Sequence, residues 1–128
     1  MNGIYIEYFR AVAITKSKIL KNISHKKISE DNLKIMQMIE EDGNVSQREI
    51  SNELGLSLGK INYCISALRD VGFIKVKNFT DSNNKLRYLY FLTPLGIKEK
   101  SIATINFLEK KKREYDILIR DLEKNSKQ

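Results

Sequence analysis

The spacing of apolar residues predicts a helix over residues 30–41. Leu33, Met36 and Ile39 recur there at intervals of three, and Ile35 precedes Ile39 by four, as on the buried face of an amphipathic helix. The run Asp42-Gly43-Asn44 comes next, and Gly and Asn tolerate the left-handed backbone that ends many helices. We therefore expect a first core helix that ends before this run.

Two capping patterns predict a pair of helices next. Ser46 and Glu49 have the spacing of a capping box, in which each side chain binds the backbone amide of the other residue. Gly55 ends that short helix, and Ser57 is the N-cap of a helix from Leu58 to about Val71. Helices of about 8 and 14 residues joined by a short glycine-containing turn form a helix-turn-helix layout. An ordinary helical hairpin has a similar pattern.

The residues after this pair predict two β-strands. Residues 73–77 alternate between apolar and basic side chains, as in a strand with one buried face. Residues 80–85 form a polar turn cluster, and residues 86–92 are rich in aromatic and branched side chains. Three helices followed by a hairpin is the element order of a winged helix. The aromatic residues expected in the hairpin core are Tyr88, Tyr90 and Phe91.

A long helix is predicted at the C-terminal end. Thr93-Pro94 has the pattern of an N-cap and first helical position, and no helix breaker occurs from Ile97 to Lys124. Such a helix has about 31 residues and a length of roughly 46 Å. Apolar residues have a three-four spacing along it, interrupted by Lys112, and we expect this seam to pack on a second copy of the chain. The predicted dimerisation residues are Ile105, Leu108, Tyr115, Ile119 and Leu122.

The predicted fold class is therefore mainly α with a small β-hairpin. A winged helix-turn-helix domain covers residues 29–93, and a long dimerisation helix covers residues 94–128. Residues 1–28 form an N-terminal extension, for which the sequence leaves open a helix over residues 4–20 or a poorly ordered arm.

The charge of the chain is basic and unevenly distributed. The net charge is +7 over 128 residues, with +5 in residues 1–28, −5 in residues 29–56, +4 in residues 57–90 and +3 in residues 91–128. A basic chain attracts phosphate, either in nucleic acid or on an anionic membrane. A solvated, lysine-rich surface produces the same total, so charge alone does not choose between these alternatives.

Several classes of protein receive no support from the sequence. The single cysteine, Cys64, excludes an intrachain disulfide, which fits a reducing cytoplasm, and we expect it to be a small core residue. No apolar run approaches the roughly 20 residues of a membrane span. Glu7 and Arg10 interrupt the apolar N-terminal run, which argues against a signal peptide. His25 is the only histidine, and no phosphate loop or nucleophile motif is present. We expect no metal, no cofactor and no enzymatic activity.

The second helix of the pair is the candidate recognition helix for DNA. Its apolar residues at the i, i+3, i+4 and i+7 positions predict a buried stripe of Ile61, Cys64, Ile65 and Leu68. On the open side, Lys60 can donate to guanine and Asn62 can pair with adenine. An exposed polar face without a partner is the alternative. The predicted base-contacting residues are Leu58, Gly59, Lys60, Asn62, Tyr63 and Ser66.

Contacts to the DNA backbone are predicted at helix N-termini and in the hairpin. Amides at a helix N-terminus suit a phosphate oxygen, which places Ser46, Gln47, Arg48 and Ser57 there. Lys85 and Arg87 are expected along the backbone or the minor groove. Lys75 and Lys77 complete the predicted wing set, although a solvated strand face explains these two lysines equally well.

Several stretches together point to one known family: VSQRE at 45–49, LGLSLGKINYC at 54–64, GFIKVKNF at 72–79, YLYFLTPLG at 88–96, FL at 107–108 and EY at 114–115. With these stretches, residues 30–122 closely resemble the MarR-family, exopolysaccharide-associated winged helix-turn-helix regulators of bacteria. The resemblance covers about three quarters of the chain and leaves out residues 1–28. It implies a transcriptional regulator that binds double-stranded DNA and is linked to polysaccharide gene clusters. It carries over no effector site.

Two other functions remain open from the sequence. A winged helix also serves as a protein-interaction module, which would need no basic residues gathered on one side. A basic protein that binds RNA or a membrane surface would show a basic amphipathic helix or exposed aromatic residues on a sheet. Only residues 1–28 come near that pattern.

Overall fold

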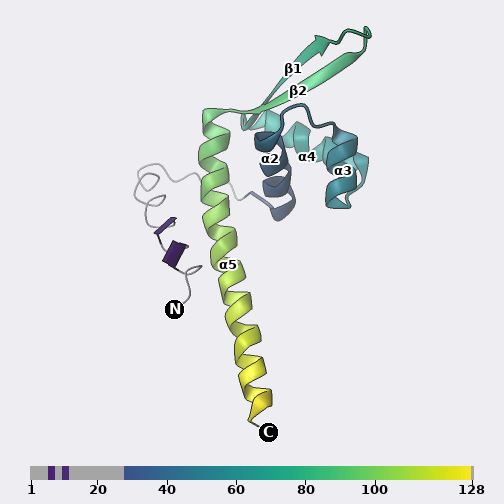
Figure 1. Cartoon of the computed structure of the whole chain (residues 1–128). Coiled ribbons are helices and arrows are strands. Elements are labelled where there is room, and N and C mark those ends of the chain that lie inside the picture. Colours follow the sequence, from purple (N-terminus) through teal and green to yellow (C-terminus); the bar gives the residue numbers. More distant parts are fainter. Residues whose placement is uncertain (1–5, 8–9, 12–27, 128) are drawn as a thin grey trace. The chain divides into compact units, whose positions relative to one another are not determined.

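Figure 1 shows the computed structural model, which describes residues 6–7, 10–11 and 28–127. Residues 6–7 and 10–11 are helical, and the rest of the helix predicted for residues 4–20 lies outside the described residues. The chain divides into two units, of which one covers residues 24–100 and the other includes residues 101–128. The boundary between the units falls within the C-terminal helix.

Three helices form as the sequence predicts: α2 (Glu30–Glu41), α3 (Gln47–Leu54) and α4 (Leu58–Asp70). The capping box is confirmed, because Ser46 Oγ accepts from the Glu49 amide at 3.0 Å and a Glu49 carboxylate oxygen accepts from the Ser46 amide at 3.0 Å. The Ser57 hydroxyl accepts from the Lys60 amide at the start of α4. Gly55 ends α3 with φ +67°, a left-handed conformation that glycine adopts without steric cost. Three residues therefore join α3 to α4.

The core is formed by the apolar faces of these helices and the base of the hairpin. The stripe predicted on α4 is confirmed, since Ile61, Cys64, Ile65 and Leu68 are all buried. Burial raises the pKa of the Cys64 thiol, an effect that the charge of Lys60 partly offsets. Cys64 is thus a core residue, as expected.

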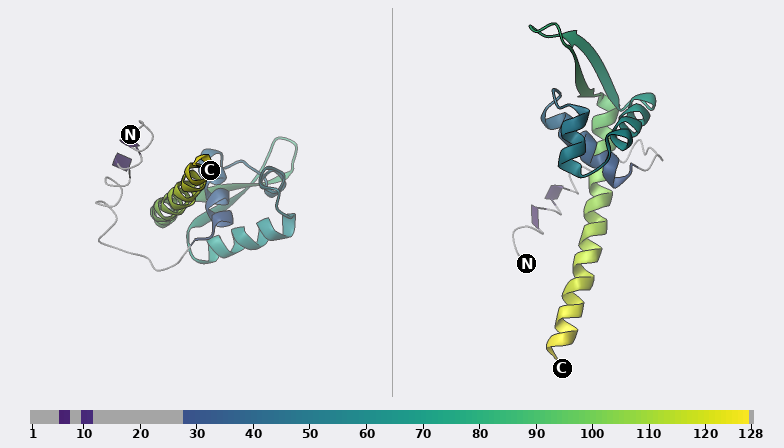
Figure 2. Two further views of the ribbon diagram at one scale, coloured as in Figure 1. Left: turned by 90° about the horizontal axis from the view of Figure 1, so that it is seen from below. Right: turned by 90° about the vertical axis from the view of Figure 1, so that its right-hand side faces the viewer.

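The hairpin consists of β1 (Ile74–Thr80) and β2 (Leu86–Leu92), paired antiparallel from Ile74 opposite Leu92 to Thr80 opposite Leu86. The prediction ended the first strand at Lys77, which is too early. Residues 78–80 are all exposed, so no alternation of apolar and polar side chains marks them as a strand. Their pairing with β2 keeps them extended. The hairpin extends beyond the three helices (Figure 2).

Only one of the three aromatic residues predicted in the hairpin core lies there. Tyr90 is 4% exposed, whereas Tyr88 is 48% and Phe91 is 40% exposed. Phe91 alternates with the buried Tyr90 and therefore lies on the opposite face of the strand. Tyr88 shares the face of Tyr90 but lies two residues farther toward the turn, where the hairpin has passed the core.

A close backbone contact fixes the base of the hairpin on the helices. The Tyr90 amide donates to the Gly43 carbonyl in the loop between α2 and α3 at 2.9 Å. A Cβ atom at Gly43 would lie 2.5 Å from the Tyr90 carbonyl oxygen, so only glycine permits this approach. The position of β2 relative to α3 is thus set by backbone atoms.

Helix α5 (Pro94–Ser126) begins as predicted, with Thr93 Oγ1 accepting from the Gly96 amide at 3.0 Å and proline at the first position. Along its C-terminal part, Ile105 is buried, and the other predicted dimerisation residues, Leu108, Tyr115, Ile119 and Leu122, are exposed. Lys112, which interrupts this seam, pairs with Asp116 at 3.0 Å. Among the described residues, no helix combines the length and the hydropathy that crossing a membrane requires.

Candidate nucleic-acid interface

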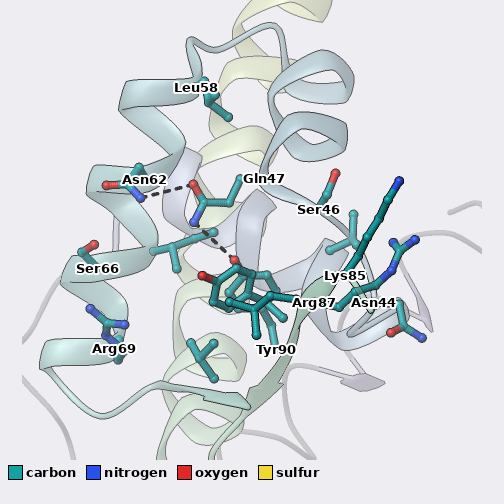
Figure 3. Close-up of a pocket in the computed structure, with 15 residues that line it drawn as sticks. Asn44, Ser46, Gln47, Leu58, Asn62, Ser66, Arg69, Lys85, Arg87 and Tyr90 are labelled. Carbon is teal, nitrogen blue, oxygen red and sulfur yellow. Dashed lines mark hydrogen bonds between the residues drawn. The ribbon is translucent and has the colours of Figure 1, made fainter. Parts of the chain in front are cut away.

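A groove of about 760 Å³ lies between α3, α4 and the hairpin. Figure 3 shows Leu58, Asn62, Ser66 and Arg69 along one side of it, all from α4. The hairpin supplies the other side, and the start of α3 lies between them. The groove thus joins the two elements that the sequence predicts to contact DNA.

The charged residues of this groove all have the same sign. Arg69 comes from the last turn of α4, and Lys85 and Arg87 come from the turn end of the hairpin. The described residues that line the groove include no carboxylate. A concave surface with only positive side chains attracts a polyanion and concentrates it there.

The predicted base-contacting residues of α4 divide into two flanks. Leu58, Asn62 and Ser66 line the groove, whereas Gly59, Lys60 and Tyr63 lie outside it. Lys60 Nζ lies 5.9 Å from the centre of the Tyr63 ring, in a cation–π contact. The structure therefore brings three of the six predicted base-contacting residues into the groove and leaves the other three exposed on the rest of the helix.

A chain of hydrogen bonds crosses the floor of the groove (Figure 3). Asn62 Nδ2 donates to Gln47 Oε1 at 3.3 Å, and Gln47 Nε2 donates to Tyr90 Oη at 3.2 Å. The chain joins α4, α3 and β2 through side chains alone. The Gln47 side chain is half-buried and bonded on both ends within the protein, whereas the predicted phosphate contact concerns the backbone amides at this helix N-terminus.

The other residues predicted at the DNA backbone are exposed. Ser46 lines the groove, and Ser57 and Arg48 lie outside it. The hydroxyl oxygens of both serines accept from amides of their own helices, which leaves each hydroxyl hydrogen available as a donor.

A carboxylate near the turn of the hairpin holds Arg87. Arg87 Nε donates to Asp81 at 2.8 Å, and the amides of Asn83 and Lys85 also donate to Asp81. The Arg87 hydrogen bond, followed by that of the Lys85 amide, lowers the pKa of Asp81, which therefore stays ionised at neutral pH. The two terminal nitrogens of the guanidinium keep their donors for a phosphate oxygen.

The remaining two residues of the predicted wing set lie elsewhere. Lys75 and Lys77 alternate with Ile74 and Val76, which pack on the core, so the lysines lie on the opposite face of β1. Lys77 Nζ lies 5.6 Å from the ring centre of Phe91, on that same face. Neither lysine lines the groove.

The prediction missed some residues that line the groove. Arg69 follows Asn62 by seven and Ser66 by three, so helical periodicity alone would have placed it on their flank. No sequence pattern pointed to Asn44, which reaches the groove because the α2–α3 loop packs against β2. Leu86 is expected only as a strand residue and Tyr88 only as part of the hairpin core, and both line the groove. No cluster of His, Cys, Asp or Glu suited to a metal ion occurs in the described part of the chain.

Comparison with protein families gives one match. Residues 32–75, which span α2, α3, α4 and the start of β1, match the family described as winged helix-turn-helix DNA-binding. No curated protein matches the sequence.

Solved structures extend this likeness beyond the matched segment. A MarR/EmrR family transcriptional regulator from Acinetobacter sp. ADP1 is 19% identical, with a TM-score of 0.55, over 100% of this chain and 99% of that one. The adhesin competence repressor AdcR from Streptococcus pyogenes is 15% identical, with a TM-score of 0.54, over 91% of this chain and 80% of that one. An A103V mutant of MepR from S. aureus is 18% identical, with a TM-score of 0.53, over 97% of this chain and 94% of that one. At these identities the comparisons establish the fold, a winged helix-turn-helix with a long C-terminal helix as in MarR-family structures.

Proposed function

We propose that this protein is a transcriptional regulator that binds double-stranded DNA sequence-specifically as a homodimer. The observation that carries the proposal is the groove between α4 and the hairpin, whose lining, within the described part of the chain, has three basic residues and no acidic one. The match of residues 32–75 to a DNA-binding family supports it. Two of the similar structures are described as a transcriptional regulator and a repressor, which supports it further.

In this proposal α4 enters the major groove, which is about 12 Å wide and admits one helix. Its N-terminal half then faces base edges, as in other helix-turn-helix proteins. Asn62 pairs with adenine, and Lys60 donates to guanine from the other flank of the helix. Lys85 and Arg87 run along the sugar-phosphate backbone or the adjacent minor groove beside α4.

The dimer would form through the C-terminal part of α5. Leu108, Tyr115, Ile119 and Leu122 keep their apolar side chains exposed at three-four spacing, and Leu122 is 70% exposed. Two copies of α4 related by a two-fold axis would read half-sites about one helical turn, or roughly 34 Å, apart. A monomeric mass in sedimentation at micromolar concentration would remove this part of the proposal.

The proposed target genes rest on the sequence resemblance alone. The stretches shared with exopolysaccharide-associated regulators suggest control of polysaccharide gene clusters. The cell compartment that fits such a regulator is the cytoplasm.

The experiment that tests the proposal is binding of the purified protein to its own promoter region and to a scrambled duplex over a salt series. We expect selective binding to the promoter with a steep dependence on salt, because phosphate contacts release counterions. The double variant Lys60→Ala with Asn62→Ala should lose the selectivity. Equal and weak binding to both duplexes would contradict the proposal and favour a protein-interaction module instead.

A further inference from the structure

The hydrogen-bond chain on the groove floor ends at the residue proposed to read adenine. Asn62 is exposed on α4, and Gln47 and Tyr90 are the half-buried and buried residues behind it. Tyr90 in turn is fixed by its backbone bond to Gly43. The Asn62 amide is therefore connected to the rigid base of the hairpin.

The two ends of an asparagine amide differ in chemistry but hardly in shape. Pairing with adenine needs Oδ1 to accept from the N6 amine while Nδ2 donates to N7. An amide that turns over presents the wrong atom at each place. The Gln47 oxygen, which lies 3.3 Å from Asn62 Nδ2, holds one orientation of Asn62.

The bond to Gln47 leaves the amide atoms of Asn62 that would pair with adenine available. An amide nitrogen carries two hydrogens, so Asn62 keeps one N–H donor and its Oδ1 acceptor after binding Gln47. Figure 3 shows the Asn62 oxygen on the side away from Gln47. Tyr90 Oη holds the Gln47 amide in place, and because a hydroxyl bonds to either end of an amide, reversing Gln47 would reverse Asn62 as well. The orientations of the two amides are thus set together.

We infer that Gln47, anchored by Tyr90, is a positioning residue that determines the base specificity of α4 by fixing the orientation of the Asn62 amide. The inference rests on the proposed function. It assigns the Gln47 side chain a role in selecting sequence, beside the phosphate contact that the sequence predicts for the amides at this helix N-terminus. It also assigns a functional role to the hydroxyl group of Tyr90, whose ring belongs to the core.

The test is selection from a library of randomised duplexes with the full chain, followed by sequencing of the bound fraction. The positions at which Asn62→Ala loses base preference define what Asn62 reads. Gln47→Met should reduce the adenine preference at those same positions by about tenfold, because a bidentate pair then loses its fixed geometry. Preferences elsewhere and the salt slope should not change. Tyr90→Phe should act at the same positions with a smaller effect, about threefold.

Gln47→Glu tests the orientation itself. A carboxylate only accepts hydrogen bonds, so it holds Asn62 with Nδ2 toward residue 47, as the structure has it. This variant should bind all duplexes more weakly because of its charge but should keep the adenine preference. Loss of that preference would overturn the inference, since it would mean that Asn62 reads DNA in the reversed orientation.

Gln37→Met is the matched control, because Gln37 is an exposed glutamine on α2 outside the groove. It should leave every preference unchanged. Equal weakening of Gln47→Met on all duplexes, or a thermal midpoint that falls without a change in preference, would show a structural role and overturn the inference. Unchanged preference in Asn62→Ala would also overturn it. A wild-type chain that enriches no sequence would overturn the proposed function and this inference together.

Discussion

Two pairs of basic residues on the hairpin differ in their surroundings rather than in their chemistry. Lys85 and Arg87, near the turn, line the groove, and Asp81 holds the Arg87 guanidinium. Lys75 and Lys77, in the first half of β1, do not line the groove, and Lys77 covers the ring of Phe91. Both pairs contribute equally to the net charge. The comparison shows that position in the fold, and not charge, separates candidate DNA contacts from a solvated strand face.

The largest expected effect on DNA affinity comes from removing the two basic residues of the hairpin that line the groove. Lys85→Ala with Arg87→Ala should weaken binding to the promoter duplex about 100-fold, because two charge-assisted bonds to phosphate are lost. The slope of log affinity against log salt should become shallower by about two. Fluorescence anisotropy with a labelled duplex measures both quantities.

The charge-matched control for that variant is Lys75→Ala with Lys77→Ala. It should weaken binding by less than about threefold, since charges farther from the DNA than the Debye length of about 8 Å are screened. Equal losses in the two double variants would contradict the distinction between the pair that lines the groove and the pair that does not.

Arg69 extends the same test to the α4 side of the groove. Arg69→Ala should reduce affinity about tenfold for all duplexes alike, because a contact to phosphate carries no sequence information. Arg120→Ala, an exposed arginine in the C-terminal part of α5, is the control and should have little effect. A change in base preference rather than in affinity would mean that Arg69 contacts bases.

Much of this geometry is predictable from the sequence, because the signals for the helices are local. Capping boxes, glycine stops and apolar spacing each involve residues a few positions apart, so α2, α3, α4 and the start of α5 were predicted within a residue or two. The same periodicity predicted the buried stripe of α4.

The groove was predicted less completely because it depends on contacts between distant residues. Which face of β1 meets α4 is set by the pairing register and by the approach of Gly43 to Tyr90. Alternation alone therefore did not show that Lys75 and Lys77 point away. The bond from Gln47 to Tyr90 joins residues 43 positions apart, and no sequence spacing encodes it.

A smaller effect is expected from the pH dependence of the carboxylate at the hairpin turn. The pKa of Asp81 is lowered in the folded chain, so its contribution to stability is present above its unfolded pKa, about 3.9, and is lost as pH falls through the folded value. The thermal midpoints of the wild type and Asp81→Asn should therefore differ at pH 7 and converge below about pH 4. A difference that grows on acidification would contradict the Arg87 bond as its cause.

The smallest effect concerns the buried face of α4. Because burial raises the pKa of Cys64, the thiol should be protonated at neutral pH, and its alkylation by iodoacetamide at pH 8 should be at least about tenfold slower in the folded chain than in urea. Mass spectrometry over time measures this rate. Rapid alkylation of the folded chain would show that the buried stripe opens readily.

The central claim is that duplex DNA occupies the groove between α4 and the hairpin. Its most direct test attaches a photoreactive group to a single cysteine in a Cys64→Ala background, either at Ser66→Cys in the groove or at Lys77→Cys on the opposite face of the hairpin. Illumination with the promoter duplex should crosslink DNA from position 66 and give little product from position 77. Equal crosslinking from both positions, or crosslinking from position 77 alone, would contradict the account.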